Sequence, residues 1–318
     1  MIESNDSSTT TYHNRRDRKT YNGTFFVLHI PKCAGTSFVN DLKHMFPSYK
    51  IYAKETCFNF MLRLISNEKE YHNITDKIVY NFTMLRSPVA HVYSQFLECK
   101  YDEWGKTQTA KTDFPRDSSD LVGLEKWIDR YHANWTIKDK DFNCYNPFNM
   151  QARAMTCIEG TNHRIRKTNH PLIIDPRHPQ IDMAIANAEK FTFIGIVEYY
   201  KLSLCALMFQ MVGWMVDGCF CQPSAPVNVS VSRSMTSASS PKRAGSPRFG
   251  AAPQIKLFNI THKTPYHSIN DLSAETLAKI KRITTIDQQL YDRYVARLIA
   301  QVGEIEAGLG EKKMMNCK

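Results

Sequence analysis

The chain of 318 residues lacks a hydrophobic run long enough to cross a membrane. Its longest apolar stretch, Leu202–Val216, spans about 15 residues, whereas a bilayer span needs roughly 20. We therefore expect a buried helix there. No signal peptide or membrane anchor is recognisable at the start of the sequence, because the first residues are polar and carry a basic cluster that begins at Arg15.

The sequence also lacks a zinc-finger cysteine pattern and an internal repeat. Nine cysteines are too few to staple a small disulfide-rich scaffold, and the pair Cys219 and Cys221 has no second pair at zinc-finger spacing. Lys and Arg number 41 against 31 Asp and Glu, which leaves a formal charge of +10. This excess favours an anionic partner, such as an acidic polysaccharide, a phosphorylated cofactor, nucleic acid or a membrane surface. No nucleic-acid-binding motif accompanies the charge, so we do not expect a nucleic acid partner.

Apolar strand patterns alternate with amphipathic helix patterns, which predicts an α/β fold: a single P-loop-like domain with a central parallel sheet flanked by helices. Strands are expected at Phe25–Ile30, Lys77–Leu85 and Phe191–Val197. Helices are expected after Gly35 and Pro88, near Leu121–Tyr131, over Tyr199–Val216 and, as one long helix, after Ser273. We expect a flexible tail at residues 1–21, the main domain at 22–222, a Ser/Ala/Pro-rich disordered insertion or mobile loop at 223–254, and the rest of the same domain at 255–318.

The first motif with chemical potential is HIPKCAGTSF at residues 29–38, between a predicted buried strand and an amphipathic helix. Small residues at Ala34 and Gly35 permit a tight turn, so backbone N–H groups and the helix N-terminus can converge on a phosphate. Lys32 adds a cation, and Thr36 and Ser37 add hydroxyl donors. The lysine precedes the small residues, so this is not the G-x-x-x-x-G-K-[ST] loop of ATP and GTP enzymes.

The second motif is MLRSPVAHVYSQF at residues 84–96, again a predicted strand, turn and helix. Arg86 would leave the strand at its carboxyl end, and Ser94 would lie on the helix that follows. Guanidinium and hydroxyl groups suit phosphate oxygens, so this pair can close on one anion. We expect His91 to face outward on this helix.

Together the motifs resemble the sulfotransferase superfamily that uses 3′-phosphoadenosine 5′-phosphosulfate (PAPS). The H-I-P-K-x-[AG]-G-T-S form is similar to the Golgi carbohydrate sulfotransferases, including the uronyl and heparan sulfate 2-O group. The segment Phe193–Glu198 weakly resembles a later strand-to-helix signature of that group. The specific match covers little more than the two motifs.

The resemblance implies transfer of a sulfuryl group from PAPS to a hydroxyl of a carbohydrate acceptor, in line and without a metal, with 3′-phosphoadenosine 5′-phosphate (PAP) as product. It implies that Lys32 is catalytic and stabilises the leaving oxygen. Arg86 and Ser94 would then hold the 3′-phosphate, with a late loop at Lys263 closing over it. The 5′-phosphate would be bound by the loop and first helical turn, which comprise Cys33, Ala34, Gly35, Thr36 and Ser37. Cys33 stands where many relatives have a hydroxyl residue.

The acceptor hydroxyl needs a general base, which is usually His or Glu in this family. His72 is the leading candidate because it lies between the two motifs, and His44 and Glu55 are rivals. We read His29 as a support for the loop. A basic segment with Arg164, Arg166 and Lys167, together with Arg153, is expected to bind an anionic or neutral carbohydrate acceptor.

Two other functions remain open on sequence grounds. A P-loop nucleotide or small-molecule kinase would share the architecture but need magnesium and ATP. A non-catalytic polysaccharide-binding module would keep the fold without turnover. The sequence does not fix the acceptor, the linkage position or the oligomeric state.

Glycosylation sequons suggest a compartment. Asn-x-Ser/Thr occurs seven times, at Asn5, Asn22, Asn73, Asn81, Asn134, Asn228 and Asn259. This favours the Golgi lumen, with the cytoplasm as the alternative. A luminal protein of this kind would need a leader or a type II membrane anchor that this sequence does not contain.

Overall fold

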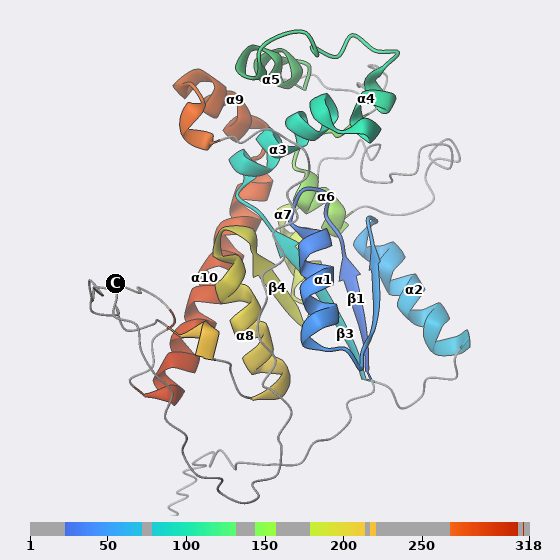
Figure 1. The fold of residues 1–318 in the computed structure, drawn as a ribbon, viewed down its shortest axis with the longest axis vertical. Coiled ribbons are helices and arrows are strands. Elements are labelled where there is room, and N and C mark those ends of the chain that lie inside the picture. Colours follow the sequence, from blue (N-terminus) through green and yellow to red (C-terminus); the bar gives the residue numbers. More distant parts are fainter. Residues whose placement is uncertain are drawn as a thin grey trace, which may run out of the picture.

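The computed structural model describes residues 23–71, 78–131, 144–156, 179–213, 217–220, 268–310 and 314. These residues form an α/β fold in which a four-stranded, all-parallel sheet is flanked by helices (Figure 1). The predicted fold class is therefore confirmed. The predicted tail at 1–21 and the predicted insertion at 223–254 lie outside the described residues.

The sheet has the strand order β2-β1-β3-β4. Its strands are β1 (Gly23–Leu28), β2 (Lys50–Lys54), β3 (Ile78–Leu85) and β4 (Phe193–Ile196). Every residue of β1 is buried, because the strand lies between β2 and β3 and helices cover the sheet. Since all strands are parallel, the turns that follow β1 and β3 emerge side by side at one edge.

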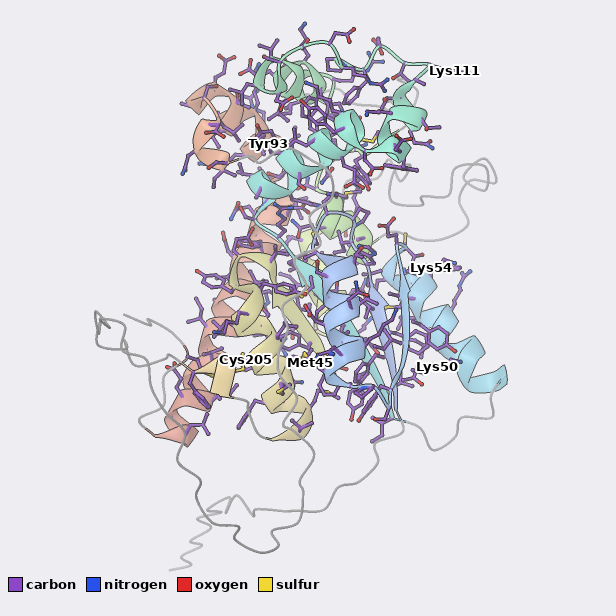
Figure 2. The ribbon with its side chains drawn as sticks, in the orientation of Figure 1. Met45, Lys50, Lys54, Tyr93, Lys111 and Cys205 are labelled. Carbon is purple, nitrogen blue, oxygen red and sulfur yellow. A yellow bond between two sulfur atoms is a disulfide. The ribbon has the colours of Figure 1, made fainter. Side chains whose placement is uncertain are left out.

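The strand β2 was missed by the sequence analysis. It pairs with β1 from Thr24↔Lys50 to Leu28↔Lys54, yet both terminal lysines are exposed and the strand shows no buried apolar run. Figure 2 shows Lys50 and Lys54 on this outer strand. Lysines on an edge strand discourage pairing with another chain, and they also remove the apolar pattern that marks a strand.

Ten α-helices are described around the sheet. They are α1 (Gly35–Met45), α2 (Phe58–Tyr71), α3 (Pro88–Tyr101), α4 (Glu103–Thr109), α5 (Asp120–Asp129), α6 (Met150–Thr156), α7 (Ile181–Ala188), α8 (Tyr200–Val212), α9 (Ala274–Ile283) and α10 (Thr285–Leu309). The described residues also include short 3₁₀ helices at Val197–Tyr199, Asp217–Cys219 and Ile269–Asp271. The helices expected after Gly35 and Pro88, near Leu121–Tyr131 and over Tyr199–Val216 correspond to α1, α3, α5 and α8.

The long helix predicted after Ser273 is divided into α9 and α10. Ser273 caps α9 as expected, since its hydroxyl accepts a hydrogen bond from the Thr276 N–H at 3.0 Å. The helix ends at Ile283, and Thr284 departs from helical geometry, with φ of −124° and ψ of 24°. The apolar stripe continues through both helices, so periodicity alone does not reveal the break.

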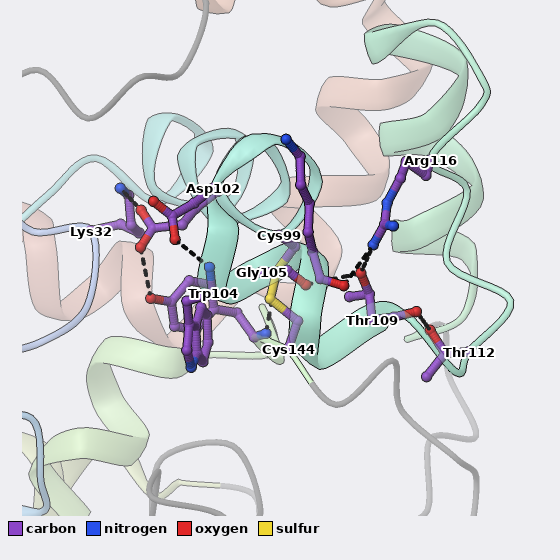
Figure 3. The surroundings of a disulfide bond; sticks show 12 residues. Lys32, Cys99, Asp102, Trp104, Gly105, Thr109, Thr112, Arg116 and Cys144 are labelled. Carbon is purple, nitrogen blue, oxygen red and sulfur yellow. Dashed lines mark hydrogen bonds and ion pairs between the residues drawn. A yellow bond between two sulfur atoms is a disulfide. The ribbon is translucent and has the colours of Figure 1, made fainter.

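Helices α3, α4, α5 and α9 form a group above the carboxyl ends of the strands (Figure 1). The Cys99–Cys144 disulfide ties α3 to the segment that leads into α6 (Figure 3). A further disulfide joins Cys205 on α8 to Cys219. Covalent links of this kind restrict the unfolded chain and so stabilise the fold.

Candidate functional site

The first motif forms the turn between β1 and α1. Lys32 and Ala34 both adopt left-handed backbone conformations, with φ of 63° and 57°. Gly35 packs so closely on His29 that a Cβ there would lie 1.9 Å from the imidazole Cδ2. Left-handed non-glycine residues are strained, and such strain is typical of turns that are shaped for a ligand. His29 thus supports the loop, as the sequence analysis expected.

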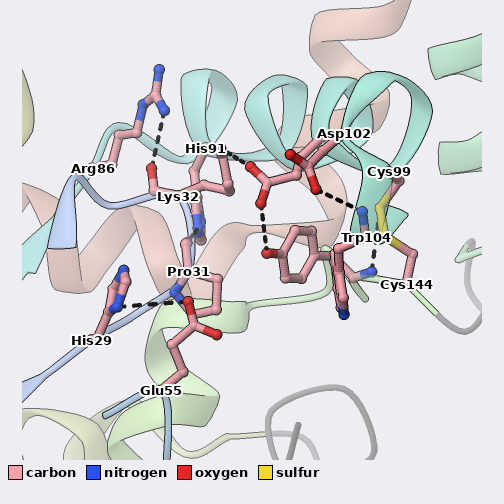
Figure 4. Close-up of polar contacts among 12 residues, drawn as sticks. His29, Pro31, Lys32, Glu55, Arg86, His91, Cys99, Asp102, Trp104 and Cys144 are labelled. Atoms are coloured by element: carbon pink, nitrogen blue, oxygen red, sulfur yellow. Dashed lines mark hydrogen bonds and ion pairs between the residues drawn. A yellow bond between two sulfur atoms is a disulfide. The ribbon is translucent and has the colours of Figure 1, made fainter. Parts of the chain in front are cut away.

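The second motif lies directly against this turn, because β1 and β3 are neighbours in the sheet. The Arg86 guanidinium donates a hydrogen bond from Nη1 to the Lys32 carbonyl oxygen at 3.0 Å (Figure 4). The Nε atom of Arg86 is buried and has no hydrogen-bond partner. A buried unpaired donor is costly unless a ligand satisfies it, so this atom fits an anion-binding role.

His91 makes a second link between the motifs, and its predicted outward orientation is wrong. The imidazole is only 1% exposed and donates from Nε2 to the Pro31 carbonyl at 2.7 Å. Burial, together with the Arg86 and Lys32 charges, lowers the pKa of His91 to about 3, although the bond to Pro31 opposes the shift. The ring is therefore neutral at physiological pH and serves as a clamp between α3 and the turn.

Lys32 is itself largely buried, with 8% of its side chain exposed. Its ammonium forms an ion pair with the Glu98 carboxylate of α3 (Figure 4). Burial and the nearby Arg86 guanidinium lower the pKa of Lys32 to about 8. The carboxylates of Asp102 and Glu55 act in the opposite direction.

Gln151 on α6 forms hydrogen bonds with residues of both motifs. Its side-chain oxygen accepts from the Arg86 backbone N–H at 2.9 Å, and its amide nitrogen donates to the Arg86 carbonyl at 2.8 Å. The same oxygen accepts from the Cys33 thiol at 3.7 Å. Burial raises the pKa of the Cys33 thiol well above its usual value, so this cysteine is a neutral packing group.

The C-terminal helix holds this arrangement in place. Asp287 at the start of α10 accepts from the backbone N–H groups of Gln151 and Ala152, at 3.1 and 2.7 Å. Glu198, after β4, accepts from the Ser87 N–H at 2.9 Å and from the Tyr291 hydroxyl of α10 at 3.0 Å. Segments more than 100 residues apart in sequence, such as Ser87 and Glu198, thus fix the backbone of the second motif.

Of the remaining cofactor residues predicted from sequence, Thr36 and Ser37 lie in the first turn of α1, and Ser94 lies within α3. Thr36 is exposed and Ser37 is partly exposed in the first turn of α1, whereas Ser94 on α3 is 6% exposed. Ala34 precedes α1 as its N-cap residue, with no side-chain hydrogen bond to the first helical turn. No side chain caps the N–H groups of this turn, so these groups can donate hydrogen bonds to an anion at the helix N-terminus.

Arg153 does not belong to an acceptor surface, contrary to expectation. It is 1% exposed, and its guanidinium donates to the Asn146 carbonyl at 2.7 Å inside the fold. The helix α6 turns this side chain toward the core, so a polysaccharide cannot reach it. The other predicted residues His72, Arg164, Arg166, Lys167 and Lys263 lie outside the described residues.

Of the candidate bases, Glu55 lies at the same edge of the sheet as the two motifs. It follows β2 directly, and its carboxylate is 3.6 Å from Nδ1 of His29 (Figure 4). Its side chain is 31% exposed, which leaves it accessible to a ligand. His44 lies in the last turn of α1, at the end of that helix that is remote from Gly35.

Glu98, Gln151 and His91 are the site residues that sequence reasoning did not identify in these roles. Helical spacing offered a partial signal, because His91, Ser94 and Glu98 recur at intervals that share one helix face. Gln151 had no such signal, since its contacts with Arg86 span 65 residues.

Within the described ranges, no group of three or more His, Cys, Asp and Glu side chains is arranged to hold a metal ion. No helix in the described part of the chain is long and apolar enough to cross a membrane. No protein-family model matches the sequence. A search of curated proteins also gives no significant match.

Proposed function

We propose that this protein is a sulfotransferase that moves a sulfuryl group from PAPS to a hydroxyl of a carbohydrate acceptor. One observation carries the proposal: the Arg86 guanidinium donates to the Lys32 carbonyl at 3.0 Å, so the two phosphate-type motifs are in contact at one edge of the parallel sheet. Ligands of open α/β sheets bind at the carboxyl ends of the strands, where both motifs lie.

The residues of the site fit a donor with phosphate groups at two positions. Arg86 has a buried, unpartnered Nε for an anion, and Ser94 follows it on α3. The strained turn at Lys32 and Ala34 leads into the N-terminus of α1, which suits a second phosphate. We assign the 3′-phosphate to Arg86 and Ser94, and the 5′-phosphosulfate to Lys32 and the backbone of residues 33–37.

The transfer forms a bond from the acceptor oxygen to sulfur and breaks the bond from sulfur to the bridging phosphate oxygen. The acceptor hydroxyl loses its proton to a base, and the electron pair of the broken bond stays on the departing PAP. Lys32 supports the developing negative charge on that oxygen, because a buried ammonium interacts strongly with it. Glu55 is the candidate base that the described residues support, while His72 remains an alternative.

A luminal location is consistent with the chain's cysteines. Disulfides join Cys99 to Cys144 and Cys205 to Cys219. Such bonds persist in oxidising compartments and are rare in the cytosol. Together with the glycosylation sequons, they favour the Golgi lumen, where carbohydrate acceptors are assembled.

Transfer of label from radiolabelled PAPS tests the proposal. The full chain is incubated with heparan, chondroitin, galactan and peptide acceptors, and the products are separated from free label. We expect label on a polysaccharide, and a loss of at least about 100-fold in Lys32→Ala and Arg86→Ala, because each removes charge stabilisation at the reacting groups.

Lys43→Ala is the matched control, since Lys43 is an exposed lysine in the last turn of α1. It should retain wild-type activity. Absence of transfer to every acceptor, or phosphate transfer from magnesium ATP instead, would reject the proposed function.

A further inference from the structure

Glu98 is held in place by an ion pair, a hydrogen bond and a neighbouring disulfide. The proposed sulfuryl transfer does not require any of these contacts. Its carboxylate is ion-paired with the Lys32 ammonium, and its side chain is only 11% exposed. The Tyr145 hydroxyl donates to the other carboxylate oxygen at 3.3 Å. The Cys99–Cys144 disulfide joins the residues adjacent to Glu98 and Tyr145 (Figure 3).

This construction holds a carboxylate firmly beside the one lysine of the first motif. Tyr145 is buried, and its backbone N–H donates to the Cys99 sulfur at 3.5 Å, so the acid and its tyrosine are fixed at both ends. A buried ion pair carries a large desolvation cost, which hydrophobic packing would avoid. A charge that is buried beside the Lys32 turn despite this cost points to a role in ligand binding.

We propose that Glu98 is a positioning residue that acts as a displaceable counter-ion of Lys32. In the ligand-free protein its carboxylate holds the Lys32 ammonium and repels other anions. A ligand with several negative charges then displaces the Glu98 carboxylate from the ammonium. The identity of that ligand as PAPS rests on the proposed function, but the competition itself does not. Two anions beside one buried ammonium repel each other strongly, because the surroundings screen them poorly.

Glu98 also affects the protonation state of Lys32. Burial and Arg86 lower the pKa of Lys32 to about 8, whereas the Asp102 and Glu55 carboxylates act in the opposite direction. The Glu98 carboxylate is ion-paired with the Lys32 ammonium, and a carboxylate in that position favours the charged form of the amine. Glu98 therefore keeps the lysine protonated and shielded before a ligand arrives. Loss of the carboxylate exposes an amine that is more easily deprotonated, and a deprotonated amine is a better nucleophile toward chemical labels.

Calorimetric titration of PAP and of pyrophosphate, without magnesium, measures the competition. Glu98→Gln keeps the side-chain size but removes the charge, so it should bind both probes about 10-fold more tightly than the wild type, which is the scale of a charged hydrogen bond. In a Lys32→Ala background the same substitution should bring a clearly smaller gain, because only the direct repulsion between Glu98 and the ligand remains and no ion pair has to be broken.

Asp102→Asn is the matched control. The Asp102 carboxylate also acts on Lys32 electrostatically, but it contacts the Trp104 N–H at 2.8 Å as the N-cap of α4, a position that Asn also fills well. This variant removes an equal charge from the same region without removing a Lys32 contact. If Asp102→Asn increased the affinity for the probes as much as Glu98→Gln does, the increase would reflect only the loss of a negative charge from the region, and the proposal would be overturned.

Reductive methylation of Lys32, followed by mass spectrometry, gives a readout that needs no ligand. Lys32 should label faster in Glu98→Gln and in Glu98→Asp, which keeps the charge but shortens the side chain, while Lys43 labels at a constant rate. If Glu98→Gln does not fold, Glu98→Asp carries this test. Unchanged labelling of Lys32 in the folded variants would overturn the proposal.

The outcomes separate this inference from the proposed function. Binding of pyrophosphate but not PAP rejects PAPS as donor, while the pyrophosphate comparison still tests Glu98. Equal or weaker probe binding by Glu98→Gln, or a gain that is equally large without Lys32, rejects the counter-ion role even if sulfuryl transfer is found. Failure of every variant and the wild type to bind either probe rejects both.

Discussion

His91 illustrates at the residue scale how a buried polar group sets local geometry. The sequence places it on an amphipathic helix whose apolar face is expected elsewhere, and this pattern predicts an outward orientation. The structure buries the ring between α3 and the Lys32 turn, where it donates to the Pro31 carbonyl. That partner is 60 residues distant, and helical periodicity carries no information about it.

This burial predicts a pH-dependent contribution to stability. The pKa of His91 is lowered from 6.5 to about 3 in the folded protein, so below pH 6.5 the unfolded chain binds a proton that the folded chain does not. The stabilising contribution is present above the unfolded pKa and is lost as the pH falls toward the folded one, by about 1.4 kcal/mol per pH unit. His91→Gln, which keeps a donor for Pro31, should lack this loss.

Urea unfolding of both proteins between pH 7.5 and 5 checks the prediction, and their difference isolates His91. Asp287 titrates with the opposite sign, because burial raises its pKa from 3.8 to about 6. Its contribution is present at low pH and is lost as the pH rises through 6, but it occurs in both proteins and cancels. A difference in unfolding free energy that stays constant with pH would contradict the account.

Elements were predictable where their own residues carried the signal. Apolar runs located β1, β3 and β4, and the Ser87-Pro88 and Ser273 signals located the starts of α3 and α9. The edge strand β2 was not predicted, because its residues are largely exposed and form no apolar run. The break at Thr284 was not predicted, because the apolar stripe continues from α9 into α10. Short helices such as α6 were missed because they depend on contacts from distant segments.

The contact between α6 and the second motif gives an element-scale prediction. Gln151→Leu removes the hydrogen bonds that hold the Arg86 backbone, at 2.9 and 2.8 Å, and leaves those buried groups unpaired. Such groups cost about 1–3 kcal/mol each. We expect lower unfolding free energy in urea and a fall in PAP affinity beyond what the change in folded fraction explains.

Gln210→Leu is a suitable control, because Gln210 donates to the Thr192 carbonyl at 2.9 Å near the start of β4, at the edge of the sheet opposite the motifs. It should leave PAP affinity unchanged. If Gln151→Leu lowered the free energy of unfolding but left PAP affinity unchanged, the hydrogen bonds between α6 and Arg86 would have no role in ligand binding.

At the scale of the whole molecule, the topology explains why the two sequence motifs lie next to each other. Parallel strands bring their carboxyl ends to one edge, so a lysine after β1 and an arginine after β3 must become neighbours once those strands pair. The supports of the site were beyond sequence reasoning. Asp287 and Gln151 are 136 residues apart, and Lys32 and Glu98 are 66 apart.

The most direct measurement of the central claim is the affinity of the full chain for PAP, by calorimetric titration without magnesium, beside that for adenosine 5′-phosphate. A site built from Lys32 and Arg86 should bind PAP far more tightly than the nucleotide without a 3′-phosphate, and Arg86→Ala should abolish that preference. Equal affinities for the two nucleotides, or binding that requires magnesium, would contradict the account.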